Sequence, residues 1–164
     1  MSEPADHALG RSRGGFGTKL HLLTCGRGVV LAATLTPGQA SESQQLDALL
    51  GKVRVGRRRR GEAVVCDKGY DVPRCREAVR RRGMRCVIPR RGLAAGKRRR
   101  KRGRPPAFDR ELYRRRNVVE RRVRGLKRYR RLSERREKLA TNFIAFVQLA
   151  VARDLLELLF SNGS

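Results

Sequence analysis

Short apolar runs separated by turn residues organise the first half of the chain. Residues 18–25 and 29–36 are rich in β-branched and apolar side chains, and a connection with two glycines at 26–28 joins them. This pattern predicts a β-hairpin whose second strand ends at Pro37. Residues 41–53 then have a Ser/Glu start and leucines at helical spacing, which predicts a short amphipathic helix.

A strand, a helix and another strand are predicted next. The apolar run 63–66 stops at Asp67, which places an acid at the C-terminal end of a buried strand. Residues 72–83 predict a helix, with a proline in its first turn and a glycine after its last. Residues 85–90 predict another short strand. The alternation of strands and helices predicts the α/β class.

Two helices are predicted in the last third of the chain. Residues 109–129 form the first, with Asp109 as its N-cap. The second covers the apolar residues 139–160, and a helix of this composition must be buried against something.

Regular structure is expected to begin near Thr18. Residues 1–17 are rich in Gly and Arg and have little to bury, which predicts a flexible basic arm. The length of 164 residues fits one domain, which we place at residues 18–160.

The charge of the chain restricts its partners. Its 41 Lys+Arg and 15 Asp+Glu give a formal charge of +26, so a polyanionic partner is expected. Nucleic acid is favoured over a membrane because no apolar run approaches about 18 residues. The N-terminus has no apolar leader, which predicts a cytoplasmic protein.

A low-complexity basic loop at 92–106 should contact phosphates. The basic residues at its centre are Lys97, Arg98, Arg99, Arg100, Lys101 and Arg102.

Cysteines and histidines are expected to be structural. The cysteines form no C-x-x-C pair, which argues against a zinc knuckle and a disulfide framework and favours reduced thiols. His21 lies in the middle of a predicted strand, where a half-buried, hydrogen-bonded imidazole is expected, and His7 lies in the arm. The cysteines are Cys25, Cys66, Cys75 and Cys86.

Polar candidate residues share one face of the helix predicted at 109–129. They are Tyr113, Arg116, Glu120 and Lys127, which fall within an arc of roughly 60° at about 100° per residue. An acid beside cationic groups, next to an apolar stripe, is the layout of a site helix. The alternative is a solvated basic helix in which Glu120 only offsets neighbouring arginines through i,i+4 pairs. Spacing alone favours neither interpretation.

These residues carry a resemblance to a known family. Asp67 in VVCDKGYD, followed by Tyr113, Arg116, Glu120 and Lys127 in the spacing Y-x2-R-x3-E-x6-K, resembles the Asp-Asp-Glu (DDE) transposases of bacterial insertion sequences. The resemblance is strongest to the large family numbered five, which is related to family four. It covers about residues 8–155, because further blocks follow in the family's order. They are ALGRSRGGFGTKLHL, LTPGQASE, VIPRR, LYRRRNVVER, LKRYRRL and KLATNFIAFVQLA.

The resemblance implies a DNA transposase with an RNase H-like fold, a mixed sheet flanked by helices. Asp67 and Glu120 would then be catalytic and would bind Mg²⁺ or Mn²⁺, because metal ions held by carboxylates stabilise the attacking and leaving oxygens of phosphodiester chemistry. Arg116 and Lys127 would bind phosphates, and Tyr113 would stack or hydrogen-bond at the DNA end. The implied partners are double-stranded DNA, at transposon ends and target, and further copies of the transposase, acting at the bacterial nucleoid.

The first of the family's catalytic acids has no counterpart in this chain. Family members carry it at the end of a strand upstream of the ALGRSRGG block, and Asp6, the nearest acid, has no apolar strand before it. The resemblance therefore implies a catalytic domain without its first strand. The implied partner is an upstream transposase segment, which ribosomal frameshifting often supplies in this family. The chain is then either the product of the downstream frame or a decayed remnant. The chain alone is not expected to transpose. The other acids Asp71, Asp109 and Glu111 are interpreted as turn and cap residues.

The rival interpretation is a non-catalytic basic nucleic-acid-binding protein of ribosomal or chromatin type. Charge alone supports it equally well. A transposase is favoured because the helix face with Glu120 coexists with Asp67, and a simple phosphate binder has no reason to carry both.

Overall fold

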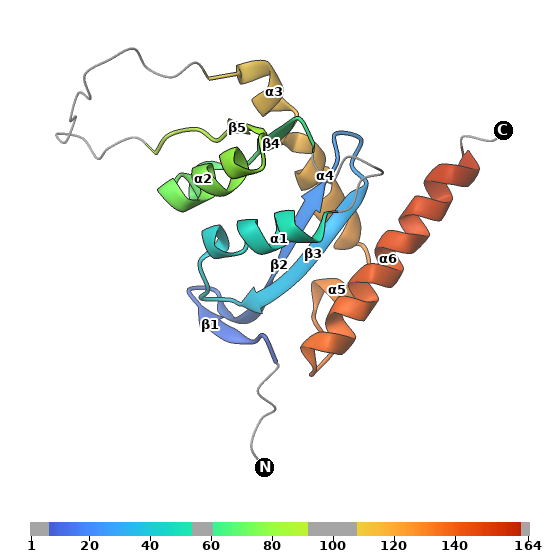
Figure 1. Cartoon of the computed structure of the whole chain (residues 1–164). Helices are drawn as coiled ribbons and strands as arrows, with labels where there is room; N and C mark the ends of the chain where they lie inside the picture. The colour runs from blue at the N-terminus through green and yellow to red at the C-terminus, as the bar shows by residue number, and fades with distance from the viewer. Residues whose placement is uncertain (1–6, 54–60, 92–107, 162–164) are drawn as a thin grey trace.

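The computed structural model describes residues 7–53, 61–91 and 108–161. Over these residues the chain forms strands, α-helices and single-turn 3₁₀ helices, labelled η, which confirms the α/β class (Figure 1). Their bounds in chain order are β1 Gly10–Ser12, β2 Gly15–Thr24, β3 Val30–Pro37, η1 Glu42–Gln44, α1 Leu46–Lys52, β4 Ala63–Val65, η2 Lys68–Tyr70, α2 Pro73–Arg81, β5 Arg85–Val87, α3 Arg110–Arg114, α4 Asn117–Leu126, α5 Arg130–Ser133 and α6 Ala140–Ser161.

The predicted hairpin is confirmed and forms the first sheet. β2 and β3 are antiparallel, with His21 opposite Thr34. In their connection the Gly28 N–H donates to the Cys25 carbonyl (3.0 Å), at a φ of +87° that favours glycine. His21 is 4 % exposed, and its Nε2 lies 2.7 Å from the Thr36 hydroxyl. The imidazole is hydrogen-bonded as predicted, and it is more fully buried than expected.

Regular structure begins earlier than the sequence suggested. β1 pairs antiparallel with the first residues of β2, with Gly10 opposite Gly17. The tight turn between these strands is possible because Gly15 adopts a φ of +104°. Regular structure therefore begins at β1 and not near Thr18, since backbone pairing orders this hairpin without apolar burial. Residues 1–6 lie outside the described residues.

The predicted strand, helix and strand form a second, parallel sheet. β4 pairs with β5 with Val64 opposite Cys86, and α2 forms the crossover between them. Pro73 lies in the first turn of α2, and Gly83, at a φ of +66°, follows its end as predicted. The main core packs between these elements and α1. Its buried residues are Leu46, Leu50, Val64, Cys75, Val79, Met84 and Ile88.

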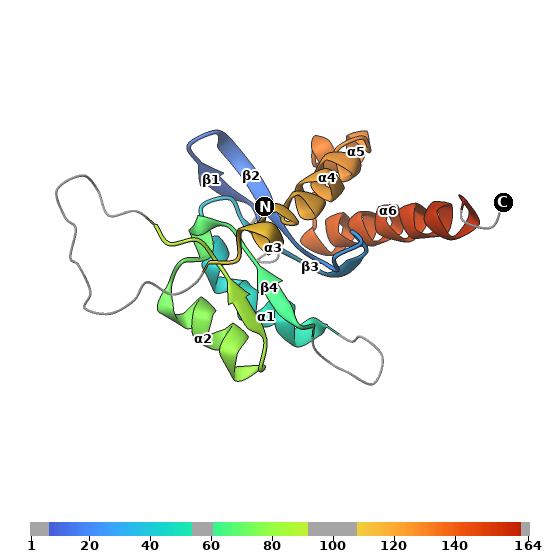
Figure 2. The ribbon, with the colours of Figure 1, turned by 90° about the horizontal axis from the view of Figure 1, so that it is seen from above.

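Helices cover both faces of the strands. α1 contacts β2, β3 and α2, whereas α4 contacts β2 and α6 contacts β3. Figure 2 shows these two helical layers on opposite sides of the strands. The strands form two separate sheets, β1-β2-β3 and β4-β5, where a single mixed sheet was expected. Within the described residues no strand joins β2 to β4, so residues 18–24 of β2, which pair only with β3, and β4, which pairs only with β5, each keep an unpaired edge.

The helix expected at 109–129 is divided into α3 and α4, and α5 follows it. Asp109 caps α3 as predicted, because its carboxylate accepts a backbone N–H of the first turn (2.8 Å). The chain then turns tightly, and the Arg116 N–H donates to the Tyr113 carbonyl (3.0 Å), a bond typical of 3₁₀ geometry. The prediction of one continuous helix is therefore wrong, and Tyr113 lies on α3 whereas Glu120 lies on α4.

Candidate active site

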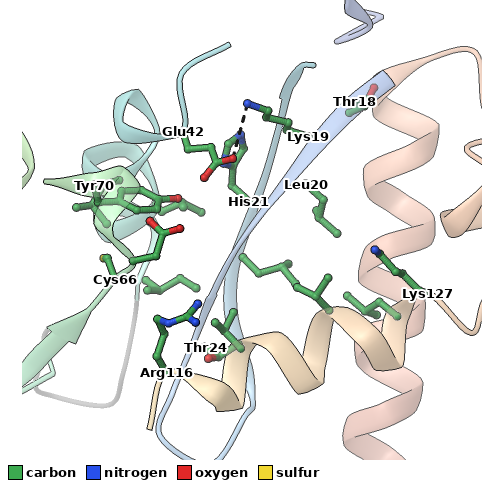
Figure 3. A pocket seen from close by; sticks show the side chains of 18 of the residues that line it. Thr18, Lys19, Leu20, His21, Thr24, Glu42, Cys66, Tyr70, Arg116 and Lys127 are labelled. Atoms are coloured by element: carbon green, nitrogen blue, oxygen red, sulfur yellow. Dashed lines mark ion pairs between the residues drawn. The ribbon is translucent and has the colours of Figure 1, made fainter. Parts of the chain in front are cut away.

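A cleft of about 520 Å³ separates the two sheets. Residues 18–24 of β2 form one wall, the end of β4 with Tyr70 forms the opposite wall, and α4 closes the base (Figure 3). A second cavity of about 420 Å³ lies between residues 23–26 and 61–65. The two cavities therefore follow the unpaired edges of β2 and β4.

Asp67 lies directly beyond β4 and lines this cleft. Pairing with β5 continues to Cys66, whose N–H donates to the Val87 carbonyl (3.2 Å), so the residue before Asp67 is still held by the sheet. The Asp67 side chain caps η2, and its Oδ1 accepts the Gly69 N–H at 2.7 Å. The acid predicted at the end of a strand is thus present, with one oxygen fixed by the backbone.

Burial keeps two ionisable neighbours of Asp67 neutral. Desolvation raises the pKa of the Cys66 thiol, and the neighbouring Cys86 and Cys75 raise it further. Desolvation also raises the pKa of the Tyr70 hydroxyl. Neither group is therefore an anionic ligand near neutral pH. All four cysteines are free thiols, as predicted.

A network around Asp71 fixes the loop that follows Asp67. Arg76 donates from Nη2 to Asp71 Oδ1 (2.7 Å), and the Arg91 N–H donates to Oδ2 (2.7 Å). Arg91 also donates from Nε to the Lys68 carbonyl (2.9 Å). Although burial acts in the opposite direction, these donors hold the pKa of Asp71 below its usual value. Asp71 therefore has the structural partners expected of a turn acid.

α4 brings two of the candidate cations to the cleft. Arg116 and Lys127, at the two ends of α4, both line it (Figure 3). Glu120 is not among the lining residues. Its Oε1 lies 2.6 Å from Arg116 Nη2, and its side chain is 52 % exposed. This is the i,i+4 pair that the alternative interpretation predicted, and through Arg116 it connects Glu120 to the cleft that contains Asp67.

Tyr113 lies beside the cleft rather than in its lining. Its ring contacts Phe108, with 5.2 Å between ring centroids, and the guanidinium carbon of Arg116 lies 5.7 Å from its ring centre. Tyr113 and Arg116 therefore meet, as their spacing suggested, at the turn between α3 and α4.

The described residues do not assemble a metal centre by themselves. Among residues 7–53, 61–91 and 108–161, no three His, Cys, Asp or Glu side chains are grouped so that they could hold a metal ion. Asp67 supplies the type of donor that Mg²⁺ prefers, so the chemistry fits but the number of ligands does not. The residues predicted to contact phosphates in the basic loop, Lys97, Arg98, Arg99, Arg100, Lys101 and Arg102, lie outside the described residues.

Two further polar residues of the cleft were not identified from the sequence. Lys19 Nζ lies 3.7 Å from Glu42 Oε1, and Figure 3 shows this pair beside His21. The period-two alternation of Lys19 and His21 along β2 was a usable signal, because it places both on one face of the strand. Glu42 gave no such signal, since an acid at a helix start has an ordinary structural explanation.

Comparisons with known proteins agree with the resemblance. Residues 4–155 match the family model described as transposase DDE domain. A Brucella ovis protein described as a transposase for insertion sequence element IS6501 is 32 % identical over 136 residues, which cover 82 % of this chain and 95 % of that protein. A Burkholderia cepacia protein described as a transposase for element IS402 is 35 % identical over 139 residues, which cover 81 % of this chain and 60 % of that protein. No solved structure matches the chain.

Proposed function

We propose, from the premise that this chain belongs to the transposase DDE domain family, that it is the catalytic part of a DNA transposase of a bacterial insertion sequence of family five. Its reaction is metal-dependent cleavage and transfer of DNA strands. The observation that carries the proposal is Asp67, which the Gly69 N–H holds in a cleft that also contains Arg116 and Lys127. A carboxylate beside two cations suits chemistry on a phosphodiester.

The proposed fold is RNase H-like, completed by a strand between β2 and β4. The second cavity is lined by the end of β2 with the turn after it, residues 23–26, and by β4 with the residues before it, 61–65. Asp67, beyond the end of β4, lines the other cleft together with earlier residues of β2. β4 therefore runs in the opposite direction to β2. A strand parallel to β4 and antiparallel to β2 would pair with both unpaired edges and would end beside Asp67. We assign this strand, with the first catalytic Asp at its end, to an upstream transposase segment.

Asp67, Glu120 and the acid of that strand are the proposed ligands of Mg²⁺ or Mn²⁺. Such ions provide Lewis-acid stabilisation for the oxygens that attack and leave phosphorus. To act as a metal ligand, Glu120 must give up its ion pair with Arg116 and bind the metal ion instead. The exchange costs little, because an i,i+4 pair of this kind contributes only about 0.3–0.5 kcal/mol and Glu120 is half exposed. Arg116 is then available for a phosphate.

Double-stranded DNA, at transposon ends and target, is the proposed substrate. The charge of +26 favours it, and Arg116, Lys127 and the basic residues 97–102 are the proposed phosphate contacts, with Tyr113 at the DNA end. More than one copy of the chain is proposed in the active complex. We place this activity at the nucleoid in the bacterial cytoplasm. No helix within the described residues is long and apolar enough to cross a membrane.

An in-frame fusion with the upstream segment tests this proposal. The isolated chain should bind duplex DNA and cleave none detectably, and the fusion should nick transposon ends with Mg²⁺ or Mn²⁺ but not with a chelator. Asp67→Asn should abolish nicking, whereas Asp47→Asn, at an exposed carboxylate of α1, should not. A fusion that binds DNA without nicking it would favour the rival, a non-catalytic nucleic-acid-binding protein.

A further inference from the structure

α6 carries apolar side chains on two opposite faces. One face packs into the fold through Phe143, Val147 and Ala150, none of which is more than 7 % exposed. This face is buried against the fold, as expected, whereas large apolar side chains from Leu149 onward are exposed on the rest of the helix. The exposed residues are Leu149 (64 %), Leu155 (37 %), Leu156 (52 %), Leu158 (42 %), Leu159 (61 %) and Phe160 (76 %).

A coiled-coil spacing runs along the outer face of α6. The residues that follow it are Ala145, Leu149, Ala152, Leu156 and Leu159, all exposed, which we call the α6 seam. Steps of four and three residues average 3.5, the repeat that keeps a stripe facing a partner helix. At about 100° per residue the seam lies roughly opposite Val147. Leu155 and Leu158 are separate from it, because they line a small cavity beside β3.

The α6 seam is free of net positive charge in a strongly basic chain. Residues 140–160 contain one cation, Arg153, and two acids, although the chain carries +26. Arg153 pairs with Glu157 (3.0 Å), and Asp154 is buried against Arg122 (2.8 Å). The seam therefore offers no cation to a DNA phosphate. Two molecules of charge +26 would repel each other least where they meet through such a surface.

The position of α6 makes the seam accessible. Figure 2 shows the second half of the helix extending beyond β3 and α4, away from the two sheets. Another molecule can therefore lie along this part of α6 without meeting the two sheets.

We propose that the α6 seam pairs with the same seam of a second copy of this chain, so that two α6 helices form a short coiled coil. Ala145 and Ala152 allow close approach of the helices, and the three seam leucines fill the interface between them. A twofold contact of this kind is self-complementary and closes at two copies. The inference deepens the proposed multi-copy complex by naming its surface, and it is tested without DNA or cleavage.

Sedimentation velocity of the whole chain tests the pairing. Nuclease-treated protein in about 0.5 M salt, which screens charge and releases nucleic acid, should show a mass of twice 18.6 kDa. Leu149→Lys and Leu156→Lys should each raise the dissociation constant at least about tenfold, with an unchanged circular dichroism spectrum. Leu156→Met, which keeps the apolar volume, should retain the dimer.

Phe16→Lys is the matched control, since it replaces another exposed apolar side chain (73 %) outside α6 with the same change in charge. It should leave the dimer intact. A monomer at concentrations up to about 0.1 mM, where even a weak dimer is populated, would overturn the proposal. So would a dimer that both leucine variants leave unchanged. If the seam instead binds the upstream segment, the chain alone is monomeric, and the proposal fails while the proposed function stands.

Discussion

Arg122 of α4 and Asp154 of α6 form an ion pair with 2.8 Å between Nη1 and Oδ2, and the Asp154 side chain is only 6 % exposed. The other Asp154 oxygen accepts the Tyr129 hydroxyl (2.8 Å), and Arg122 Nε donates to the Gly28 carbonyl (2.8 Å). A single buried carboxylate, with its partner Arg122, thus connects α6, α4 and the turn between β2 and β3. It helps to fix the helix that carries Glu120.

Asp154→Ala should therefore be strongly destabilising. The substitution leaves the Arg122 guanidinium and the Tyr129 hydroxyl without their carboxylate, and loss of one partner of a buried pair costs roughly 3 kcal/mol or more. Urea denaturation measures the change in the free energy of unfolding. Glu157→Ala is the control: it breaks an exposed pair with Arg153 on the same helix and should change stability by about 0.5 kcal/mol or less. Equal losses in both variants would contradict the assigned role of Asp154.

Gly69→Ala should impair cleavage by the fused protein. A Cβ at Gly69 would lie 2.8 Å from Asp67 Oδ1, so the carboxylate must move from its present position. A shift on this scale in a reacting group should lower the nicking rate by about tenfold to a hundredfold. Gly125→Ala is the control, because open space surrounds that position within α4, and it should stabilise the protein by about 0.5–1 kcal/mol without loss of nicking. An unchanged rate in Gly69→Ala would show that the Asp67 geometry does not matter.

Binding of duplex DNA by the isolated chain should depend strongly on salt. Affinity should fall by orders of magnitude between about 50 and 200 mM salt, because phosphate contacts release counterions. Arg116→Ala and Lys127→Ala should each reduce the slope of log K against log salt by about 1. Arg81→Ala, at an exposed cation of α2, is the control and should change it less. Salt-independent binding would contradict both nucleic-acid interpretations.

His21 should make the stability of the fold fall in mild acid. Burial lowers the pKa of His21, with Glu42 acting in the opposite direction and Lys19 in the same direction. Because the folded value lies below the unfolded value of about 6.5, the unfolded chain binds the proton more readily. The contribution of neutral His21 to the stability of the fold is therefore fully present above about pH 6.5 and is lost as the pH falls below this value. Urea denaturation at about pH 7 and about pH 5 should show a smaller difference for His21→Gln than for the native chain. The same difference in both proteins would contradict the assigned role of His21 in acid sensitivity.

Much of the fold could be predicted because its signals are local. Pro73 and Gly83 mark the ends of α2, and Asp109 caps α3, without reference to distant residues. The division of the helix after Tyr113 had no such signal, since the residues on both sides of the turn are compatible with a helix. The separation of the strands into two sheets depends on what pairs with β2 and β4, which local patterns do not report.

The candidate site was predictable in part for the same reason. Asp67 could be placed because a strand end is a local feature. Glu120 could be assigned to a helix, but its pairing with Arg116 depends on side-chain conformation, and both interpretations allowed it. Lys19 and Glu42 line the cleft only because β2 lies across it from the end of β4, a long-range arrangement.

The most direct test of the central claim is the nicking activity of the fused protein that carries Asp67→Asn and Glu120→Gln together. Both substitutions remove charge with little change in volume, so the fold and the affinity for duplex DNA should remain close to those of the unsubstituted fusion. Mg²⁺- and Mn²⁺-dependent nicking of transposon ends should fall below detection, because two of the proposed metal ligands are lost. Nicking that persists at the original rate would show that these carboxylates do not bind the metal and would contradict the assigned site.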